Sequence, residues 1–182
     1  MKIIGVVGMP ASGKGEFSRI AKEMNIPIVV LGDIIRNAVK DAGLKITDKN
    51  MGEMSKCLRR GLGMDALAQL SIPIIEEQKG NIVIVDGIRG DAEVDTLSGH
   101  FHDFHLVAVH SSFETRLKRL SERKRSDDLP DADSLKMRDD REIGWGLLNA
   151  FSMADLKIDN EGTMEEFEMK VKDTLYKLRM EK

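Results

Sequence analysis

The most informative stretch of this sequence is GMPASGKGEF, residues 8–17. It fits the phosphate-loop pattern, in which a glycine is followed by four residues and then by Gly-Lys. Residues 2–7, immediately before it, form a short apolar run rich in β-branched side chains, which is typical of a buried strand. From Lys14 onward, apolar residues recur every three or four positions, which predicts a helix. A glycine-rich loop between a strand and a helix is the context that this pattern requires.

The composition of this loop is suited to binding phosphate groups. Its glycines allow backbone conformations that a Cβ atom would block, so backbone N–H groups can point inward and form an anion-binding nest. The helix that begins near Lys14 adds a partial positive charge, and the Lys14 ammonium adds a full charge for the β- and γ-phosphates. The flanking strand and helix argue against the alternative, a glycine-rich turn with an incidental lysine. We therefore predict that the loop binds a nucleotide through Gly8, Met9, Pro10, Ala11, Ser12, Gly13, Lys14 and Gly15.

The two residues after the lysine depart from the usual pattern. A serine or threonine normally stands there, and its hydroxyl helps to hold Mg²⁺, but this chain has Gly15. Glu16 follows, and its carboxylate should repel the α-phosphate of a bound nucleotide. We favour an arrangement in which Glu16 turns away and interacts with the helix N-terminus. The alternative is a contact between Glu16 and Mg²⁺-bound water.

The overall composition excludes several other classes of protein. The chain has 182 residues, which suggests one domain over residues 1–182 with a substantial core. A net charge of −3 and an aromatic content of 4% give no indication of a nucleic-acid surface. Cys57 is the only cysteine in the sequence, which excludes an internal disulfide and a zinc lid of four cysteines, and we expect it to be buried. Because neither a signal peptide nor a membrane-spanning apolar run is evident, we expect a cytoplasmic protein without a membrane partner.

Strand-like and helix-like patterns alternate along the chain. Residues 81–87 (NIVIVDG) form an apolar run that ends on an acid, which is typical of a parallel strand covered on both faces. The alternation predicts an α/β fold of the three-layer α/β/α P-loop NTPase type, with a five-stranded parallel sheet, helices on both faces and a small lid. Ligands of such sheets bind at the carboxyl ends of the strands, so residues 8–16, 31–36, 86–89 and 159–162 should share one rim. The strands are expected at residues 2–7, 27–31, 81–87, 104–110 and 154–159.

The expected helices are less regular than the strands. Residues 50–79 have a helical pattern that two glycines and Pro73 should break. Ser111 with Glu114 has the spacing of a capping box at the start of a helix. Helices are expected from Lys14, over residues 33–41, in parts of 50–79, over 113–120, over 134–153 and from 163 onward, with a charged loop over 121–133.

Three segments resemble adenylate kinases and other nucleoside monophosphate kinases. GMPASGKGE resembles the adenylate-kinase loop, in which a glycine also follows the lysine. LGDIIR, residues 31–36, is similar to the segment in which Gly-Asp opens the acceptor helix and an arginine follows three residues later. VDGIRG, residues 85–90, resembles the Asp-Gly-Phe-Pro-Arg run of these kinases, with one residue fewer between the glycine and the arginine.

The C-terminal part resembles a second kinase family. ADLKIDNEGTMEEF, residues 154–167, is similar to the last strand and turn of dephospho-coenzyme-A kinases. That turn lies beside the ATP adenine in that family, which implies that Asn160 and Gly162 contact the base. The chain is thus identified as a member of the P-loop small-molecule kinases, within an archaeal group described as adenylate-kinase-like or dephospho-coenzyme-A-kinase-like.

The resemblance implies roles for residues on the acceptor side, within a segment of about residues 32–79 and at the end of the central strand. Asp86, placed like a Walker-B acid, would bind Mg²⁺ through water. Arg36 and Arg89 would bind an acceptor phosphate, and Asp33 would orient the attacking group or hold a ribose. Another interpretation makes Asp33 a helix cap and Arg36 a surface arginine. Glu93 stands near the place of the base-reading glutamine of the nucleoside monophosphate kinases, which argues against adenine as the acceptor base.

Arginines that follow the fourth strand indicate a lid over about residues 121–135. Phosphoryl transfer needs positive charge around the migrating group, and a closing loop can supply it once water is excluded. Arg119 with Arg123 resembles the pair that starts an adenylate-kinase lid. For any single arginine, a solvated charged face remains the alternative. The candidates for this cage are Arg116, Arg119, Arg123, Arg138 and Arg141.

These observations predict an ATP-dependent kinase that uses Mg²⁺. The acceptor would be a small phosphorylated molecule, either a nucleoside monophosphate or a metabolite such as dephospho-coenzyme A. The alternative is a slow P-loop NTPase that acts as a nucleotide-dependent switch or assembly factor for a protein or RNA. An acceptor clamp argues against the switch, which needs no second phosphate site. The predicted catalytic residues are Lys14, Arg89, Arg119, Arg123 and Arg138.

Overall fold

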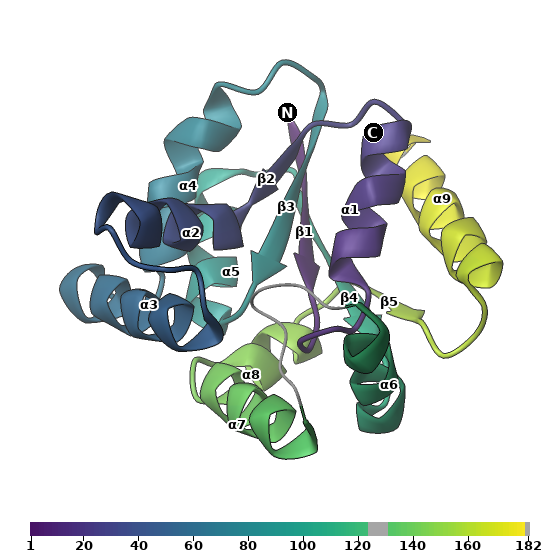
Figure 1. Ribbon diagram of the computed structural model, residues 1–182. Coiled ribbons are helices and arrows are strands. Elements are labelled where there is room, and N and C mark those ends of the chain that lie inside the picture. Colours follow the sequence, from purple (N-terminus) through teal and green to yellow (C-terminus); the bar gives the residue numbers. More distant parts are fainter. Residues whose placement is uncertain (124–130, 181–182) are drawn as a thin grey trace.

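A five-stranded parallel sheet forms the centre of the computed structural model, which describes residues 1–123 and 131–180. The strand order is β2-β3-β1-β4-β5, and each neighbouring pair is parallel. This architecture confirms the predicted α/β fold, with helices on both faces of the sheet (Figure 1). The strands are β1 (Lys2–Val7), β2 (Ile28–Val30), β3 (Ile82–Ile88), β4 (Phe104–His110) and β5 (Leu156–Asp159).

Alternation of side chains along the strands divides the core into two layers. In β1, Ile3 and Val7 point to one face of the sheet, whereas Ile4 and Val6 point to the other, as the two-residue period of a strand requires. One face packs against α1 (Lys14–Glu23) and α9 (Met164–Met180). The opposite face packs against α2 (Leu31–Asp41), α4 (Ala66–Glu76), α5 (Asp91–His100) and α8 (Leu147–Ser152).

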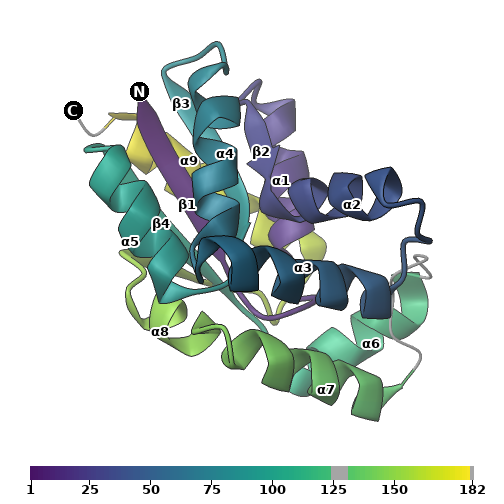
Figure 2. The ribbon, with the colours of Figure 1, turned by 90° about the vertical axis from the view of Figure 1, so that its left-hand side faces the viewer.

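The remaining helices surround the carboxyl edge of the sheet. They are α3 (Asp48–Leu62), α6 (Phe113–Arg123) and α7 (Ala132–Ile143). Figure 1 shows α6, α7 and α8 beyond the arrowheads of the strands, and Figure 2 shows α3 running alongside α7. The rim on which the sequence places the site is therefore flanked by helices from three parts of the chain.

Several helix boundaries differ from those expected. Helix α2 begins at Leu31, so Asp33 lies in its first turn and is not its cap. Pro73 does not end α4, because the core packing of Leu67, Ala68 and Ile75 outweighs the loss of one backbone donor. The helix expected over 134–153 is interrupted between α7 and α8, where Gly146 adopts a φ of 92°.

Further differences concern features that the sequence patterns did not reveal. Helix α5 was not predicted, because only two of its residues, Val94 and Leu97, belong to the core. Ser112 is the residue that caps α6, because its Oγ accepts from Thr115 N, while the Ser111 hydroxyl donates to backbone oxygens elsewhere. Cys57 is exposed, so the expectation that it is buried was wrong. None of the helices in the described ranges has the length and apolar character needed to cross a membrane.

Candidate active site

The loop between β1 and α1 has the shape of an anion-binding nest. Ala11 and Gly13 both have left-handed backbone conformations, with φ of 61° and 113°. A Cβ atom on Gly13 would lie 2.2 Å from Nδ2 of Asn160, so only glycine fits at this position. The Gly13 carbonyl accepts from Phe17 N at 2.9 Å and thereby starts α1. The loop thus leads directly into a helix N-terminus, where backbone N–H groups favour an anion.

Lys14 lies across the loop that precedes it. Its ammonium donates to the carbonyl oxygens of Gly8 at 2.6 Å and Met9 at 2.9 Å. Burial, and after it the nearby positive charge of Arg89, lower the pKa of Lys14 to about 8. The Lys14 charge is therefore destabilised in the free protein and would be stabilised by an anion in the loop.

Asp86 lies on the α1 side of the sheet, as side-chain alternation from Ile84 requires, and a bulge in β3 follows it. Asp86 pairs with Val6, but the next residue of β1 pairs with Ile88, which leaves Gly87 as an extra residue with a φ of 94°. The Asp86 carboxylate is buried and accepts a hydrogen bond of 2.8 Å from Ser18 Oγ of α1. Burial raises the pKa of Asp86, against the effect of the Lys14 charge. Asp86 and Lys14 thus lie close enough for each charge to affect the pKa of the other.

Glu16 pairs with an arginine of its own helix, which neither predicted orientation included. Its Oε1 accepts from Nε of Arg19 at 2.6 Å, one turn further along the outer face of α1. Arg19 also pairs with Glu23 on that face. The carboxylate is therefore partly neutralised by an arginine of its own helix.

Asn160, predicted to contact the adenine, and Arg119, predicted to be catalytic, both donate hydrogen bonds to oxygen atoms at or beside the phosphate loop. The Asn160 side chain is buried, and its Nδ2 donates to the Ser12 carbonyl at 2.9 Å. Arg119 donates to Ser111 Oγ and to the Asn160 carbonyl, both at 2.9 Å. Both side chains are thus occupied by protein oxygens, and their contact with adenine or with a transferred phosphoryl group stays a prediction.

Arg116 is a third side chain that forms hydrogen bonds to the loop region. It donates to the Pro10 carbonyl at 3.1 Å and makes two bonds to the Asp139 carboxylate, at 2.9 and 2.7 Å. Arg116 and Asp139 are both buried, so this pair ties α6 and α7 to the loop. Arg123 ends α6, but its side chain lies outside the described part of the structure, as do residues 124–130 of the expected lid.

On the acceptor side, arginines from different elements converge on two carboxylates. Arg89, after β3, and Arg138, on α7, both bind Oε1 of Glu142. Glu142 is fully buried, and although burial alone would raise its pKa, the charges of Arg89, Arg138 and Lys14 lower it. The structure therefore brings Lys14, Arg89 and Arg138, three of the predicted catalytic residues, around one carboxylate that the sequence did not indicate.

Asp48 is the second of these carboxylates. Arg141 makes two bonds to it, at 2.9 and 2.8 Å, and Nε of Arg138 lies 3.7 Å from its Oδ1. The Arg141 guanidinium passes over Gly52, whose Cβ position is 3.0 Å from Nη1. The Asp48–Arg141 pair thereby joins the start of α3 to α7.

Arg36 and Asp33 pair with one another on the exposed side of α2. Arg36 also lines a small cavity of about 60 Å³, together with Arg89, Arg138 and Arg141. Arg36 and Arg89 thus line the same cavity, whereas Asp33 is not among the residues that line it, and the acceptor clamp stays a prediction.

Glu93 is buried and does not face this cavity. Its carboxylate accepts from Arg59 Nη2 at 2.6 Å and from the backbone N–H of Arg89 at 2.7 Å. The Arg59 guanidinium also lies 4.4 Å from the ring centroid of Trp145, a cation–π contact. Glu93 therefore holds the backbone of Arg89 in place.

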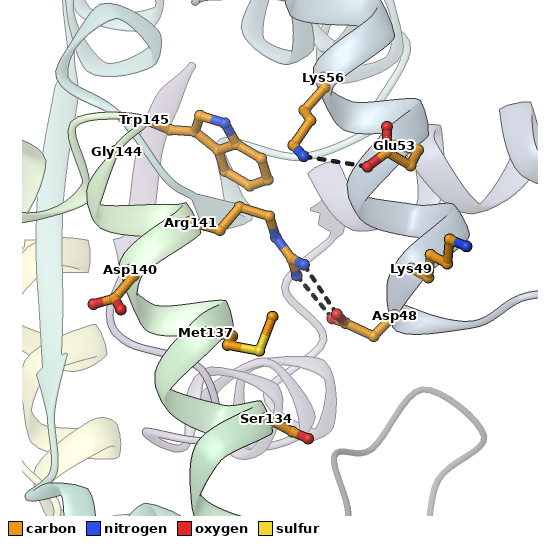
Figure 3. A pocket seen from close by; sticks show the side chains of 10 residues that line it. All are labelled: Asp48, Lys49, Glu53, Lys56, Ser134, Met137, Asp140, Arg141, Gly144 and Trp145. Carbon is orange, nitrogen blue, oxygen red and sulfur yellow. Dashed lines mark hydrogen bonds and ion pairs between the residues drawn. The ribbon is translucent and has the colours of Figure 1, made fainter.

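A larger groove of about 670 Å³ lies between α3 and α7 (Figure 3). Figure 3 shows Arg141 reaching from α7 to Asp48, with the Trp145 indole at one end of the pair. The small cavity and the groove share Asp48, Arg141 and Trp145, so they adjoin. The groove is lined by Asp48, Lys49, Glu53, Lys56, Ser134, Met137, Asp140, Arg141, Gly144 and Trp145.

Comparison with known proteins assigns the chain to a family. It is 55% identical over 181 residues to the UPF0200 protein of Methanoregula boonei, with 100% of each chain covered. The chain belongs to the UPF0200 family. Its residues 7–136 also match the AAA domain family.

Solved structures agree on the fold. TT1252 from Thermus thermophilus superimposes with a TM-score of 0.69 at 16% identity, over 97% of each chain. Shikimate kinase from Aquifex aeolicus superimposes with a TM-score of 0.55 at 19% identity, over 98% of each chain. At these identities the likeness concerns the fold alone, which is that of the small P-loop kinases, as the sequence predicted.

Sequence reasoning missed four residues of the site: Asp48, Arg59, Glu142 and Trp145. The three charged ones lie in segments rich in charge, where a buried ion pair has the same local pattern as a solvated surface. Trp145 had a usable signal, because the only tryptophan of the chain stands between two glycines at the end of a charged helix.

Proposed function

We propose that this protein transfers the γ-phosphoryl group of ATP, in the presence of Mg²⁺, to a small phosphorylated acceptor. The observation that carries this proposal is the position of Arg89 and Arg138. Both lie close enough to the P-loop lysine to lower its pKa, and both bind the same carboxylate, Glu142. Positive charge from two further elements is thus gathered where a phosphoryl group leaving the loop would move.

The residues at the loop fit a nucleotide triphosphate with its cation. The nest offers backbone N–H groups, and the Ser12 hydroxyl is buried without a partner among the described residues. Asp86 and Ser18 supply buried oxygen atoms, which are the ligands that Mg²⁺ prefers, directly or through water. When bound, Mg²⁺ would neutralise phosphate charge. Lys14 would exchange its bonds to Gly8 and Met9 for the β- and γ-phosphates.

The acceptor would bind between the end of β3 and helices α2, α3 and α7. Arg36 and Arg89 would bind its phosphate group, because both line the small cavity and a guanidinium forms paired bonds with phosphate oxygens. Glu142 would keep Arg89 and Arg138 oriented before the acceptor arrives. The rest of the acceptor would extend into the adjoining groove between α3 and α7.

The test is phosphoryl transfer from γ-labelled ATP with Mg²⁺ to a panel of acceptors. The panel contains AMP, CMP, UMP, GMP, their deoxy forms and dephospho-coenzyme A, with a tube without acceptor as the control. A labelled product with one acceptor would support the proposal and identify the acceptor. Label released only as free phosphate, at one slow rate in every tube, would contradict it and favour the nucleotide-dependent switch.

A further inference from the structure

The hydroxyl that normally follows the P-loop lysine is absent from its usual position, which Gly15 occupies. Ser18 stands three residues later on α1, and residues three apart share one face of a helix. Its Oγ donates to Oδ2 of Asp86 at 2.8 Å, and both residues are more than nine-tenths buried. A buried hydroxyl bonded to the Walker-B acid is therefore present one helical turn beyond its usual place.

We propose that the Ser18 hydroxyl replaces the missing loop hydroxyl and, together with Asp86, holds the Mg²⁺ that accompanies ATP. This inference rests on the proposed function, because it assumes that the loop binds ATP with Mg²⁺. It goes further in assigning a position in the cation site to a residue that lies outside the phosphate-loop pattern.

The orientation of the hydroxyl is suited to this role. Helical side chains lean toward the N-terminus of their helix, so the Ser18 side chain leans toward the loop and Lys14. The hydroxyl gives its proton to Asp86, which leaves its oxygen lone pairs for a cation or for water bound to a cation. Lys14 lies close enough to Asp86 to oppose the rise in the pKa of that carboxyl, so the pair adjoins the site of the phosphates.

The ordinary alternative is a buried serine that bonds to its own helix. Ser71 of α4 is of this kind, because its hydroxyl donates to the Ala68 carbonyl three residues earlier. Ser18 instead reaches from α1 to the carboxylate at the end of a strand, 68 positions away in the sequence. The Ser18 hydroxyl thus donates to Asp86, the acid that we assign to the Mg²⁺ site, and not to a helix carbonyl.

A serine at position 15 would restore the hydroxyl that usually follows the P-loop lysine, which allows a rescue experiment. A Cβ atom built on Gly15 meets no heavy atom of the described residues within 4 Å, and Gly15 is not in the left-handed region. Serine therefore fits at position 15 without displacing any neighbour in the part of the chain that the structure describes. A chain with Ser18→Ala and Gly15→Ser has the hydroxyl in its usual place and lacks the one that we assign.

The experiment measures cation binding and does not depend on turnover. Mg²⁺ is titrated into the full chain with ATP by calorimetry, and Mn²⁺ binding to the same complex is followed by its electron paramagnetic resonance signal. We expect Ser18→Ala to weaken cation binding by about 10- to 100-fold, as loss of a supporting ligand does, while ATP affinity in EDTA is unchanged. The double variant should regain most of the loss, and Ser71→Ala, which changes a buried serine of α4 on the other face of the sheet, should behave like the unaltered chain.

The outcomes separate this inference from the proposed function. If the unaltered chain binds ATP equally well with and without Mg²⁺, both fail. If Mg²⁺ strengthens ATP binding equally in the unaltered chain and in Ser18→Ala, only the inference is overturned. A loss in Ser18→Ala that Gly15→Ser does not repair would make Ser18 a structural residue and would also overturn it. Circular dichroism of each variant confirms that it is folded.

Discussion

Asp48 and Arg141 are 93 positions apart in the sequence and form a bidentate ion pair, with N–O distances of 2.8 and 2.9 Å. The pair joins the N-terminal turn of α3 to α7, next to both the acceptor cavity and the groove of Figure 3. It therefore sets the distance between the two helices that enclose the proposed acceptor site.

Asp48→Ala should loosen this enclosure. Arg141 loses its two bonds, and the charge-assisted bonds removed are worth about 1.5–3 kcal/mol of unfolding free energy. Once the acceptor is known, its KM should rise more than kcat falls, because the change affects binding and not the phosphate loop. Urea unfolding and steady-state kinetics measure the two effects. The control is Arg60→Ala on the same helix, an exposed residue that lines neither the cavity nor the groove and should change neither quantity measurably.

Arg89→Ala should abolish transfer and leave ATP binding intact. The side chain meets the proposed acceptor site and Glu142, and the loop that holds the nucleotide keeps all its own contacts. Loss of an arginine that stabilises the transferred charge typically costs about 10³- to 10⁵-fold in kcat. The measurement is transfer to the acceptor found in the panel, with ATP binding followed separately. Transfer at the normal rate in this variant would refute the acceptor clamp, and Arg60→Ala, an exposed arginine of α3, is the matched control.

ATP affinity should fall as pH rises above about 8. The pKa of Lys14 in the free protein is about 8, and the phosphates favour the charged form, so the pKa is higher in the complex. Below pH 8 the lysine is charged in both states and contributes no slope. Above it, each pH unit should weaken binding by up to about tenfold, until the pKa of the complex is reached. Titrations between pH 6.5 and about pH 10 measure this, and Lys14→Met should bind weakly without the slope. An equal slope in that variant would assign the effect to another group.

Gly13→Ala should disrupt the phosphate loop, whereas Gly15→Ala should not. Gly13 has a φ of 113°, and its Cβ would lie 2.2 Å from Nδ2 of Asn160, the side chain that holds the Ser12 carbonyl. The left-handed conformation alone costs about 1–2 kcal/mol for alanine, and displacement of Asn160 adds to that. ATP binding and thermal unfolding of both variants test this. The prediction fails if the two alanine variants bind ATP equally well.

Asp139→Ala should destabilise the whole chain. It leaves the Arg116 guanidinium buried without its carboxylate, and breaking a buried pair in this way costs about 3–5 kcal/mol. The effect should include weaker ATP binding, because Arg116 also holds the Pro10 carbonyl of the loop. Urea unfolding measures it against Glu23→Ala, which removes an exposed partner of Arg19 and should cause no measurable loss.

The sequence by itself determined the sheet, the phosphate loop and the rim. These features depend on local patterns, namely the apolar runs of β1, β3 and β4, the glycine spacing of residues 8–15 and the acid at the end of β3. A strand of a parallel sheet must end at the same edge as its neighbours, so the order of motifs along the chain sufficed to bring Lys14, Asp86 and Arg89 together.

Only the tertiary structure decided which charges meet. Asp48, Arg138, Arg141 and Glu142 carry the same local pattern as any solvated helix, and their pairing depends on how α3 and α7 pack beyond the sheet. The Ser18 hydroxyl is a further case, because nothing in its neighbourhood along the chain distinguishes it from an ordinary helical serine. Its contact with Asp86 exists because α1 packs on the face of β3 to which side-chain alternation along the strand directs that carboxylate. Side-chain pairing between distant elements follows from the sheet order and the helix packing, which no local pattern encodes.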